Sequence, residues 1–224
     1  MSSKLMAPQK ISDSQERLLI LIGLIMGLLI LVPILKRFIA VRIVLDLFLT
    51  AIAIAMVYTI SSKKRHVIVG LFLAIVLLAS VWFQYFHQDK TVAAIGMIAG
   101  VFFIGVIIKS LLGFMFKSEE VTREVIYAAI LLYLLAALMW AFGYMFLELL
   151  DPASFNIPHI TGRGDLLVFQ YYSFVTISTL GYGDITPGTE VAKTFSALEA
   201  VVGQLYLVIV VAWLVGMHVS KKSK

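Results

Sequence analysis

Long apolar runs separated by short polar breaks make up most of the chain. A helix that crosses a hydrocarbon core of about 30 Å needs about 20 predominantly apolar residues. Six runs reach this length, at residues 17–36, 39–60, 67–86, 91–116, 124–150 and 191–217. The pattern therefore predicts an all-α membrane protein with six transmembrane helices.

The segment 151–190 breaks this pattern. It is rich in Gly, Pro, Thr and Asp, and its only apolar stretch, 166–178, is too short to cross a membrane. We expect a short helix there, with Asp165 as its N-cap, because an aspartate at that position accepts hydrogen bonds from the free amides of the first turn. A short helix followed by non-helical chain predicts a re-entrant segment.

Composition and charge agree with this class and exclude others. Residues of the hydrophobic class make up 61% of the chain and charged ones only 14%, against about 25% in an average soluble domain. The absence of cysteine excludes disulfides, thiolate metal sites and cysteine nucleophiles. The net charge of +5 comes from residues at the ends of apolar runs, which argues against a nucleic-acid partner.

The positions of the basic residues predict the topology. Most of the lysines and arginines fall in the two tails, in the loops at 61–66 and 117–123, or beside them. Cytoplasmic loops carry an excess of such residues. We therefore expect both termini in the cytoplasm and the segment 151–190 on the outside.

The candidate chemistry lies in "TISTLGYGD", residues 176–184. Unpaired backbone groups at membrane depth are costly unless they line a polar path. Gly181 and Gly183 enter left-handed conformations readily, so successive carbonyls can point the same way. Thr179 adds a hydroxyl, and we expect Tyr182 to brace the loop against Tyr171 and Tyr172. The product is a ladder of oxygen ligands for a dehydrated alkali cation.

This stretch closely resembles the signature of potassium channels, whose filters are built in this way. The order of span, short helix, filter and span over 124–217 is similar to their pore domain. The resemblance implies that potassium ions bind at Thr179, Leu180, Gly181 and Tyr182, and that Gly183 completes the filter. The filter support that it implies comprises Thr176, Ser178, Asp184 and Tyr172. Leu180 stands where valine is commoner, and Val175 where some members place a carboxylate.

The last span carries the candidate gating residues. Gly203 matches the position of a hinge glycine in the family, but close packing against the pore helix explains it equally well. Helical spacing places Leu207 and Val211 below it, on the face expected to line the cavity. Glu199 is an acid at membrane depth, and we favour a hydrogen-bonding role behind the filter over a proton or ion site.

The fourth span bears on the gating mechanism. Voltage-gated relatives carry a series of arginines there, whereas this span has a single Lys109 near its inner end. One charge moving through 100 mV is worth only about 2.3 kcal/mol. Strong voltage gating is therefore not expected.

Together these observations predict a homotetrameric, passive potassium channel that is no enzyme. Its expected partners are three further identical subunits, membrane lipids and an undefined regulatory subunit, with potassium ions in the filter and no other cofactor. It resembles compact prokaryotic members, which implies a bacterial or archaeal plasma membrane. The predicted organisation has two transmembrane domains, a four-helix peripheral, voltage-sensor-like domain at 17–116 and a pore domain at 124–217. The pore domain contains the pore helix at 166–178 and the filter at 178–183. A cytoplasmic linker at 117–123 joins the two domains, and cytoplasmic tails lie at 1–16 and 218–224.

Three alternatives remain. A nonselective cation channel would follow from small changes around Tyr182 or Asp184. A potassium uptake protein would carry four degenerate pore segments, whereas this chain has one. The third alternative is a membrane enzyme, a non-conducting scaffold or a regulatory subunit that has kept a pore-like hairpin. An enzyme would need clustered polar groups in its spans, and those present are scattered.

Overall fold

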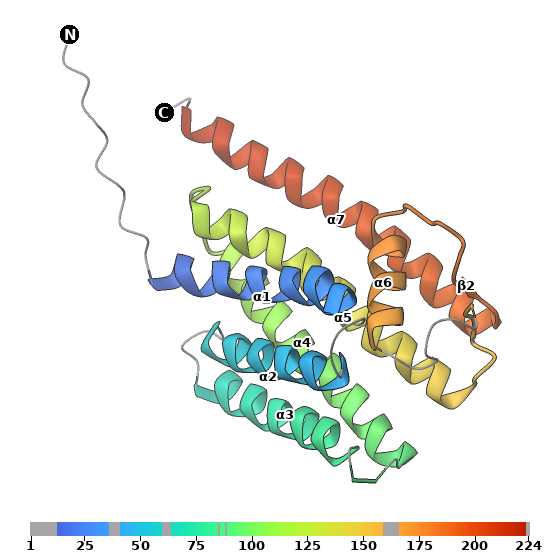
Figure 1. The fold of residues 1–224 in the computed structure, drawn as a ribbon. Coiled ribbons are helices and arrows are strands. Elements are labelled where there is room, and N and C mark those ends of the chain that lie inside the picture. Colours follow the sequence, from blue (N-terminus) through green and yellow to red (C-terminus); the bar gives the residue numbers. More distant parts are fainter. Residues whose placement is uncertain are drawn as a thin grey trace.

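The chain is a bundle of long helices crossed by one short helix (Figure 1). The computed structural model describes residues 13–35, 41–59, 64–84, 86–87, 89–158 and 166–222. Asp165, the predicted N-cap of the short helix, lies outside these residues. The helices are α1 (Asp13–Leu35), α2 (Val41–Thr59), α3 (Lys64–Phe83), α4 (Lys90–Met115), α5 (Arg123–Leu150), α6 (Leu166–Ile177) and α7 (Glu190–Lys222).

Four of these helices are long and apolar enough to cross a membrane. Their apolar parts are Asp13–Leu31, Lys90–Met115, Arg123–Leu150 and Glu190–Met217. Such helices make this an integral membrane protein. In α2 and α3 the apolar stretches among the described residues are shorter, Leu45–Val57 and Val67–Phe83. That these two also cross the membrane remains a prediction.

Several helix boundaries differ from the predicted ones. The third helix spans Lys64–Phe83, so it begins inside the predicted loop 61–66 and ends before residue 86. The first helix begins at Asp13, inside the predicted tail 1–16, and its first turn holds Asp13 and Glu16. Acidic side chains stabilise the positive, N-terminal end of a helix, so the helix extends into this polar segment. The last helix continues to Lys222, into the predicted tail 218–224. The short helix ends at Ile177, one residue early.

Helix α4 lies between α3 and α5, and small residues set its distance from both. A Cβ added at Gly96 would lie 1.9 Å from Ser80 Oγ of α3, and one at Gly100 would lie 3.0 Å from the ring of Phe142 of α5. Helix α5 also packs against α1 and α6, and α6 packs against α7. The short helix is thereby held between α5 and α7 (Figure 1).

Two short antiparallel strands join the chain before α6 to the chain after it. Strand β1 (Phe155–Asn156) pairs with β2 (Thr186–Pro187), in the register Phe155 to Pro187 and Asn156 to Thr186. The amide of Gly188 donates to the carbonyl of Ser154 at 2.8 Å. These bonds tie the chain before α6 to the chain that leads into α7.

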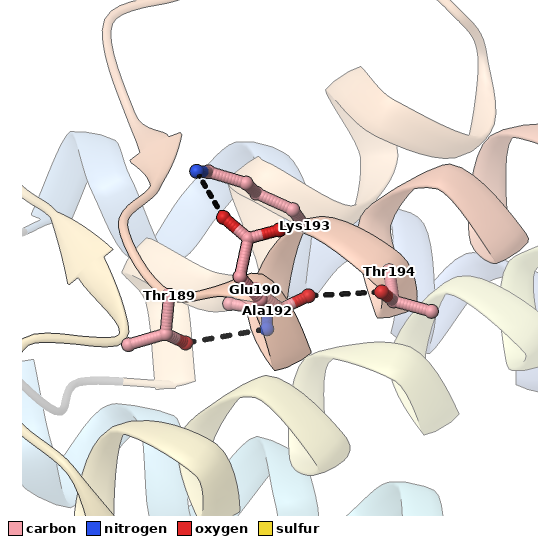
Figure 2. Close-up of polar contacts among 5 residues, drawn as sticks. All are labelled: Thr189, Glu190, Ala192, Lys193 and Thr194. Carbon is pink, nitrogen blue, oxygen red and sulfur yellow. Dashed lines mark hydrogen bonds and ion pairs between the residues drawn. The ribbon is translucent and has the colours of Figure 1, made fainter.

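Helix α7 has a well-formed beginning (Figure 2). Thr189 precedes it, and the Thr189 hydroxyl accepts the amide of Ala192 at 3.3 Å, as an N-cap does. Thr194 Oγ1 donates to the carbonyl of Glu190 at 2.9 Å, and Lys193 Nζ pairs with Glu190 Oε1 at 2.7 Å. That ion pair is exposed, so it contributes little to stability. The cap fixes where the last helix starts, and hence the length of the loop before it.

Candidate functional site

The chain after α6 turns its amides back toward the end of that helix. The amide of Thr179 donates to the carbonyl of Thr176 at 2.9 Å. The amides of Leu180 and Gly181 both donate to the carbonyl of Val175, at 3.0 and 3.2 Å. In the part of the chain that the structure describes, no amide bonds to the carbonyls of 179–183. This backbone therefore presents unused acceptors.

Alternate residues of this segment have left-handed backbones. The φ angles are 58° at Thr179, 56° at Gly181 and 75° at Gly183. Glycine adopts such angles without steric penalty, and the sequence predicts both glycines. The left-handed backbone of Thr179 was not predicted, because a β-branched residue with positive φ is a genuine outlier. The alternation begins one step earlier than the glycines indicate.

The same segment is open to its surroundings in a single chain. Leu180 is 56% exposed and Tyr182 is 67% exposed. A Cβ added at Gly181 or Gly183 would meet nothing within 4 Å. Nothing within the described part of one chain encloses the carbonyl ladder.

The predicted support residues make specific contacts. Tyr171 donates its hydroxyl proton to Asp184 Oδ2 at 2.7 Å, which ties the outer end of the segment to α6. Tyr172 lies 2.7 Å from Ser196 Oγ of α7 through its hydroxyl. Ser178 Oγ donates to the carbonyl of Phe174 at 2.7 Å. These bonds join the segment, α6 and α7.

The expected bracing of Tyr182 is not formed within one chain. Among the described residues its ring makes no contact with the rings of Tyr171 or Tyr172. The ring of Tyr172 instead packs edge-on against Tyr144 and Phe155, at centroid distances of 5.0 and 5.3 Å. The aromatic cluster thus holds α6 against α5 and β1 and does not include the ring of Tyr182.

Glu199 lies behind α6 and is fully buried, at 0% exposure. Tyr144 of α5 donates to Glu199 Oε2 at 2.5 Å, and Ser173 of α6 contacts Glu199 Oε1. Ser173 Oγ also contacts the carbonyl of Ala137 at 2.7 Å. The favoured hydrogen-bonding role of this acid is confirmed. Its partners Tyr144 and Ser173 were missed, because nothing in the sequence says which residues lie opposite it.

Gly203 packs against the end of the short helix. A Cβ added there would lie 2.2 Å from the carbonyl oxygen of Ile177. The structure therefore shows close packing at this glycine, and its role as a hinge stays a prediction. Leu207 and Val211 are 42% and 53% exposed, so they are uncovered within one chain. Their neighbours Val208 and Ile209 are exposed as well, so exposure does not single out a cavity face.

Gln204 contacts the segment directly. Its Nε2 donates to Thr179 Oγ1 at 3.0 Å. Gln204 is not among the site residues predicted from the sequence. A polar residue in an otherwise apolar span is a functional signal by default, and that rule would have found it.

The arrangement offers neutral oxygen ligands only. Carbonyl oxygens and a hydroxyl suit a hard cation, and the C-terminal end of α6 carries partial negative charge beside them. Among the described residues no group of three or more His, Asp or Glu side chains gathers for a metal ion. Oxygen ligands of this kind suit a hard cation that is held weakly.

Comparison with known proteins gives a match in the second half of the chain, over less than half of its residues. Residues 128–219 match the family model for ion channels. The match includes α6, the carbonyl ladder and most of α5 and α7, and it supports an ion channel, a kind of protein that is not an enzyme. No curated protein and no solved structure matches the chain.

Proposed function

We propose that this chain is the subunit of a potassium-selective channel, which conducts potassium passively through a pore built by residues 166–183. One observation carries the proposal: three alternate residues of a solvent-open segment, Thr179, Gly181 and Gly183, have left-handed backbones and leave their carbonyls unpaired. Such a ladder replaces the hydration shell of a potassium ion. The ligands are the oxygens of Thr179, Leu180, Gly181 and Tyr182, and potassium ions are the only cofactor proposed.

A homotetramer is part of this proposal. One chain supplies one wall of a pore, and closed cyclic symmetry supplies the others. Helix α7 supports this, because 6% of its most apolar segment is buried within the chain, against 61% for α5. An uncovered apolar helix beside an uncovered ladder fits contact with three further copies and with lipid. Native mass spectrometry in detergent would test the count, and a monomer or dimer as the conducting form would contradict it.

The remaining proposals concern gating and placement. Leu207 and Val211 would line the cavity on the inner side of the filter, with α7 as the inner gate. Both termini would lie in the cytoplasm of a prokaryotic plasma membrane. Residues 17–116 would form a peripheral domain without strong voltage sensing, around a pore domain at 124–217, and a regulatory subunit remains part of the hypothesis.

The first experiment measures the reversal potential of purified protein in planar bilayers, with potassium on one side and sodium on the other. We expect a value near the potassium equilibrium potential. Gly181→Ala should abolish this current, because a residue with a Cβ at φ 56° costs about 1–2 kcal/mol and disturbs the ladder. Gly105→Ala is the matched control, since a Cβ there also meets nothing within 4 Å but the residue lies in a helix.

The outcomes separate the alternatives. Equal permeability to both ions would place the chain among nonselective cation channels. No current under any voltage, pH or membrane tension would favour a non-conducting scaffold. Current that survives in Gly181→Ala would show that the ladder is not the pore.

A further inference from the structure

Gln204 bridges the last helix and the inner end of the ladder. It follows Gly203, whose backbone lies directly against the carbonyl of Ile177 at the end of α6. This close approach brings the Gln204 side chain within reach of Thr179, and its Nε2 donates to Thr179 Oγ1 at 3.0 Å. A Cβ at residue 203 would clash with this carbonyl, so the glycine permits the close approach.

The acceptor of this bond is an unusual residue. Thr179 is β-branched, yet its φ is 58°. The backbone of a non-glycine residue in that conformation is strained by about 1–3 kcal/mol, and the conformation persists only where its surroundings hold it. Within the described residues, the Gln204 amide is the side chain that holds the Thr179 hydroxyl.

The bond also controls what the hydroxyl can do. A threonine hydroxyl has one proton and two acceptor lone pairs. When one lone pair accepts the Gln204 amide, the oxygen is held in one orientation and the other lone pair remains for a cation. A ligand fixed in advance binds more tightly than one that must be ordered, because the ordering entropy is not lost on binding.

We propose that Gln204 is a positioning residue that fixes the Thr179 hydroxyl as the innermost cation ligand of the ladder. This rests on the proposed channel function and adds a determinant of ion affinity outside the filter sequence. Gln204 itself is neutral and acts through Thr179. A substitution of Gln204 should therefore change cation binding only while the Thr179 hydroxyl is present. If Gln204 had a purely structural role, the substitution would have its effect with or without that hydroxyl.

The test uses a divalent cation as a probe of the innermost site. Barium applied from the cytoplasmic side to the purified full chain in planar bilayers should block the potassium current. Native protein is compared with Gln204→Leu, Thr179→Val and the double variant. Gln204→Leu should weaken the block by about fivefold, equivalent to one hydrogen bond. In the Thr179→Val background, the same change should have no further effect.

Controls keep the outcome interpretable. Val208→Ala changes an exposed residue one turn further along α7 and should leave the block unchanged. If Gln204→Leu does not assemble, Gln204→Met removes the same amide with an unbranched side chain.

Two results would overturn the proposal: a block unchanged or strengthened in Gln204→Leu, or an equal weakening with and without the Thr179 hydroxyl. In both cases a potassium-selective native current would leave the channel function intact. An absence of native current would defeat both proposals.

Discussion

Thr179 is the single non-glycine residue of the described chain with a positive φ. A left-handed backbone at a β-branched residue persists only when neighbouring contacts enforce it. Here the amide of Thr179 bonds to the carbonyl of Thr176, and its hydroxyl bonds to Gln204. The two glycines of the ladder need no such help, so the strain is concentrated at its inner end.

Glu199 and its partners pose a question of proton placement. The Ser173 hydroxyl has one proton but contacts two acceptors, the Ala137 carbonyl and the Glu199 carboxyl group. A carbonyl cannot donate. If Ser173 donates to Ala137, then the proton between Ser173 and Glu199 must belong to Glu199. If Ser173 instead donates to Glu199, the acid is a carboxylate, and in both arrangements Glu199 links α5, α6 and α7.

This gives a prediction for substitutions at Glu199. Glu199→Gln keeps one donor and one acceptor, and should retain the stability and ion selectivity of the native protein. Glu199→Ala removes the acceptor of the buried Tyr144 hydroxyl and leaves Ser173 with the Ala137 carbonyl alone, and should lower the free energy of unfolding by about 1–3 kcal/mol. Denaturant titration in detergent measures this loss.

An infrared band of a protonated carboxylic acid, absent from Glu199→Gln, would identify the proton. A Glu199→Gln variant as unstable as Glu199→Ala would show instead that the site requires a carboxylate.

At the scale of elements, the crossing of α6 and α7 depends on a residue without a side chain. The Ile177 carbonyl at the end of α6 occupies the place where a Cβ of residue 203 would be. Because this neighbour is backbone, it cannot turn aside as a side chain could. The crossing therefore fixes both the end of the short helix and the reach of Gln204.

Gly203→Ala should consequently destabilise the protein by about 1–3 kcal/mol through overpacking, and should weaken selectivity. Denaturant titration and the reversal potential measure the two effects. Gly216→Ala is a matched control in the same helix, because a Cβ there meets nothing within 4 Å. It should be neutral or stabilising by up to about 1 kcal/mol, as alanine is in a helix. A Gly203→Ala channel that is stable but gates differently would support the hinge interpretation.

The start of α4 provides a test that depends on pH. Asp89 Oδ1 accepts the amides of Thr91 and Val92 at 2.6 and 3.2 Å. The hydrogen bond from Val92, followed by that from Thr91, lowers the pKa of Asp89 below its ordinary value of 3.8. A carboxyl group whose pKa is lower in the folded protein stabilises it at neutral pH and loses this effect as pH falls through the lowered pKa.

The thermal midpoint of Asp89→Ala should therefore lie below that of the native protein at neutral pH, and the difference should shrink at pH values below 3.8. Asp89→Asn serves as the control, because its amide oxygen caps the helix without titrating. A difference that is constant across this pH range would contradict the role of the charged cap.

At the scale of the whole molecule, the helices are covered unequally. Helices α4 and α5 pack against each other and fill the centre, while α7 and the ladder are exposed. Exposed apolar helices are expected in lipid. Exposed, unpaired backbone carbonyls are not, because each costs several kcal/mol at membrane depth. The single chain is therefore one part of a larger pore in the proposed function.

The arrangement also predicts weak voltage dependence. Within α4 the single charge away from the helix start is Lys109. A charge that crosses 100 mV contributes about 2.3 kcal/mol, and Lys109 lies too near the helix end to cross the whole field. The conductance should change little with voltage over a range of about 100 mV on either side of zero. Lys109→Gln should leave the relation unchanged, and a steep native curve would contradict the prediction.

The sequence by itself determined the membrane class, the short helix and the position of the ladder. These follow from local rules: the length of an apolar run, the conformational freedom of Gly181 and Gly183, and the turn chemistry between two helices. Each rule depends on a few consecutive residues, so no partner from elsewhere in the chain is needed.

Only the tertiary structure decided which residues meet. It paired Glu199 with Tyr144 and Ser173, placed Gly203 against Ile177, and brought Gln204 to Thr179. The left-handed backbone of Thr179 belongs to the same group, because its strain is compensated by a contact 25 residues away. Such pairings depend on how helices cross, and a crossing is set by packing of side chains that are distant in the sequence.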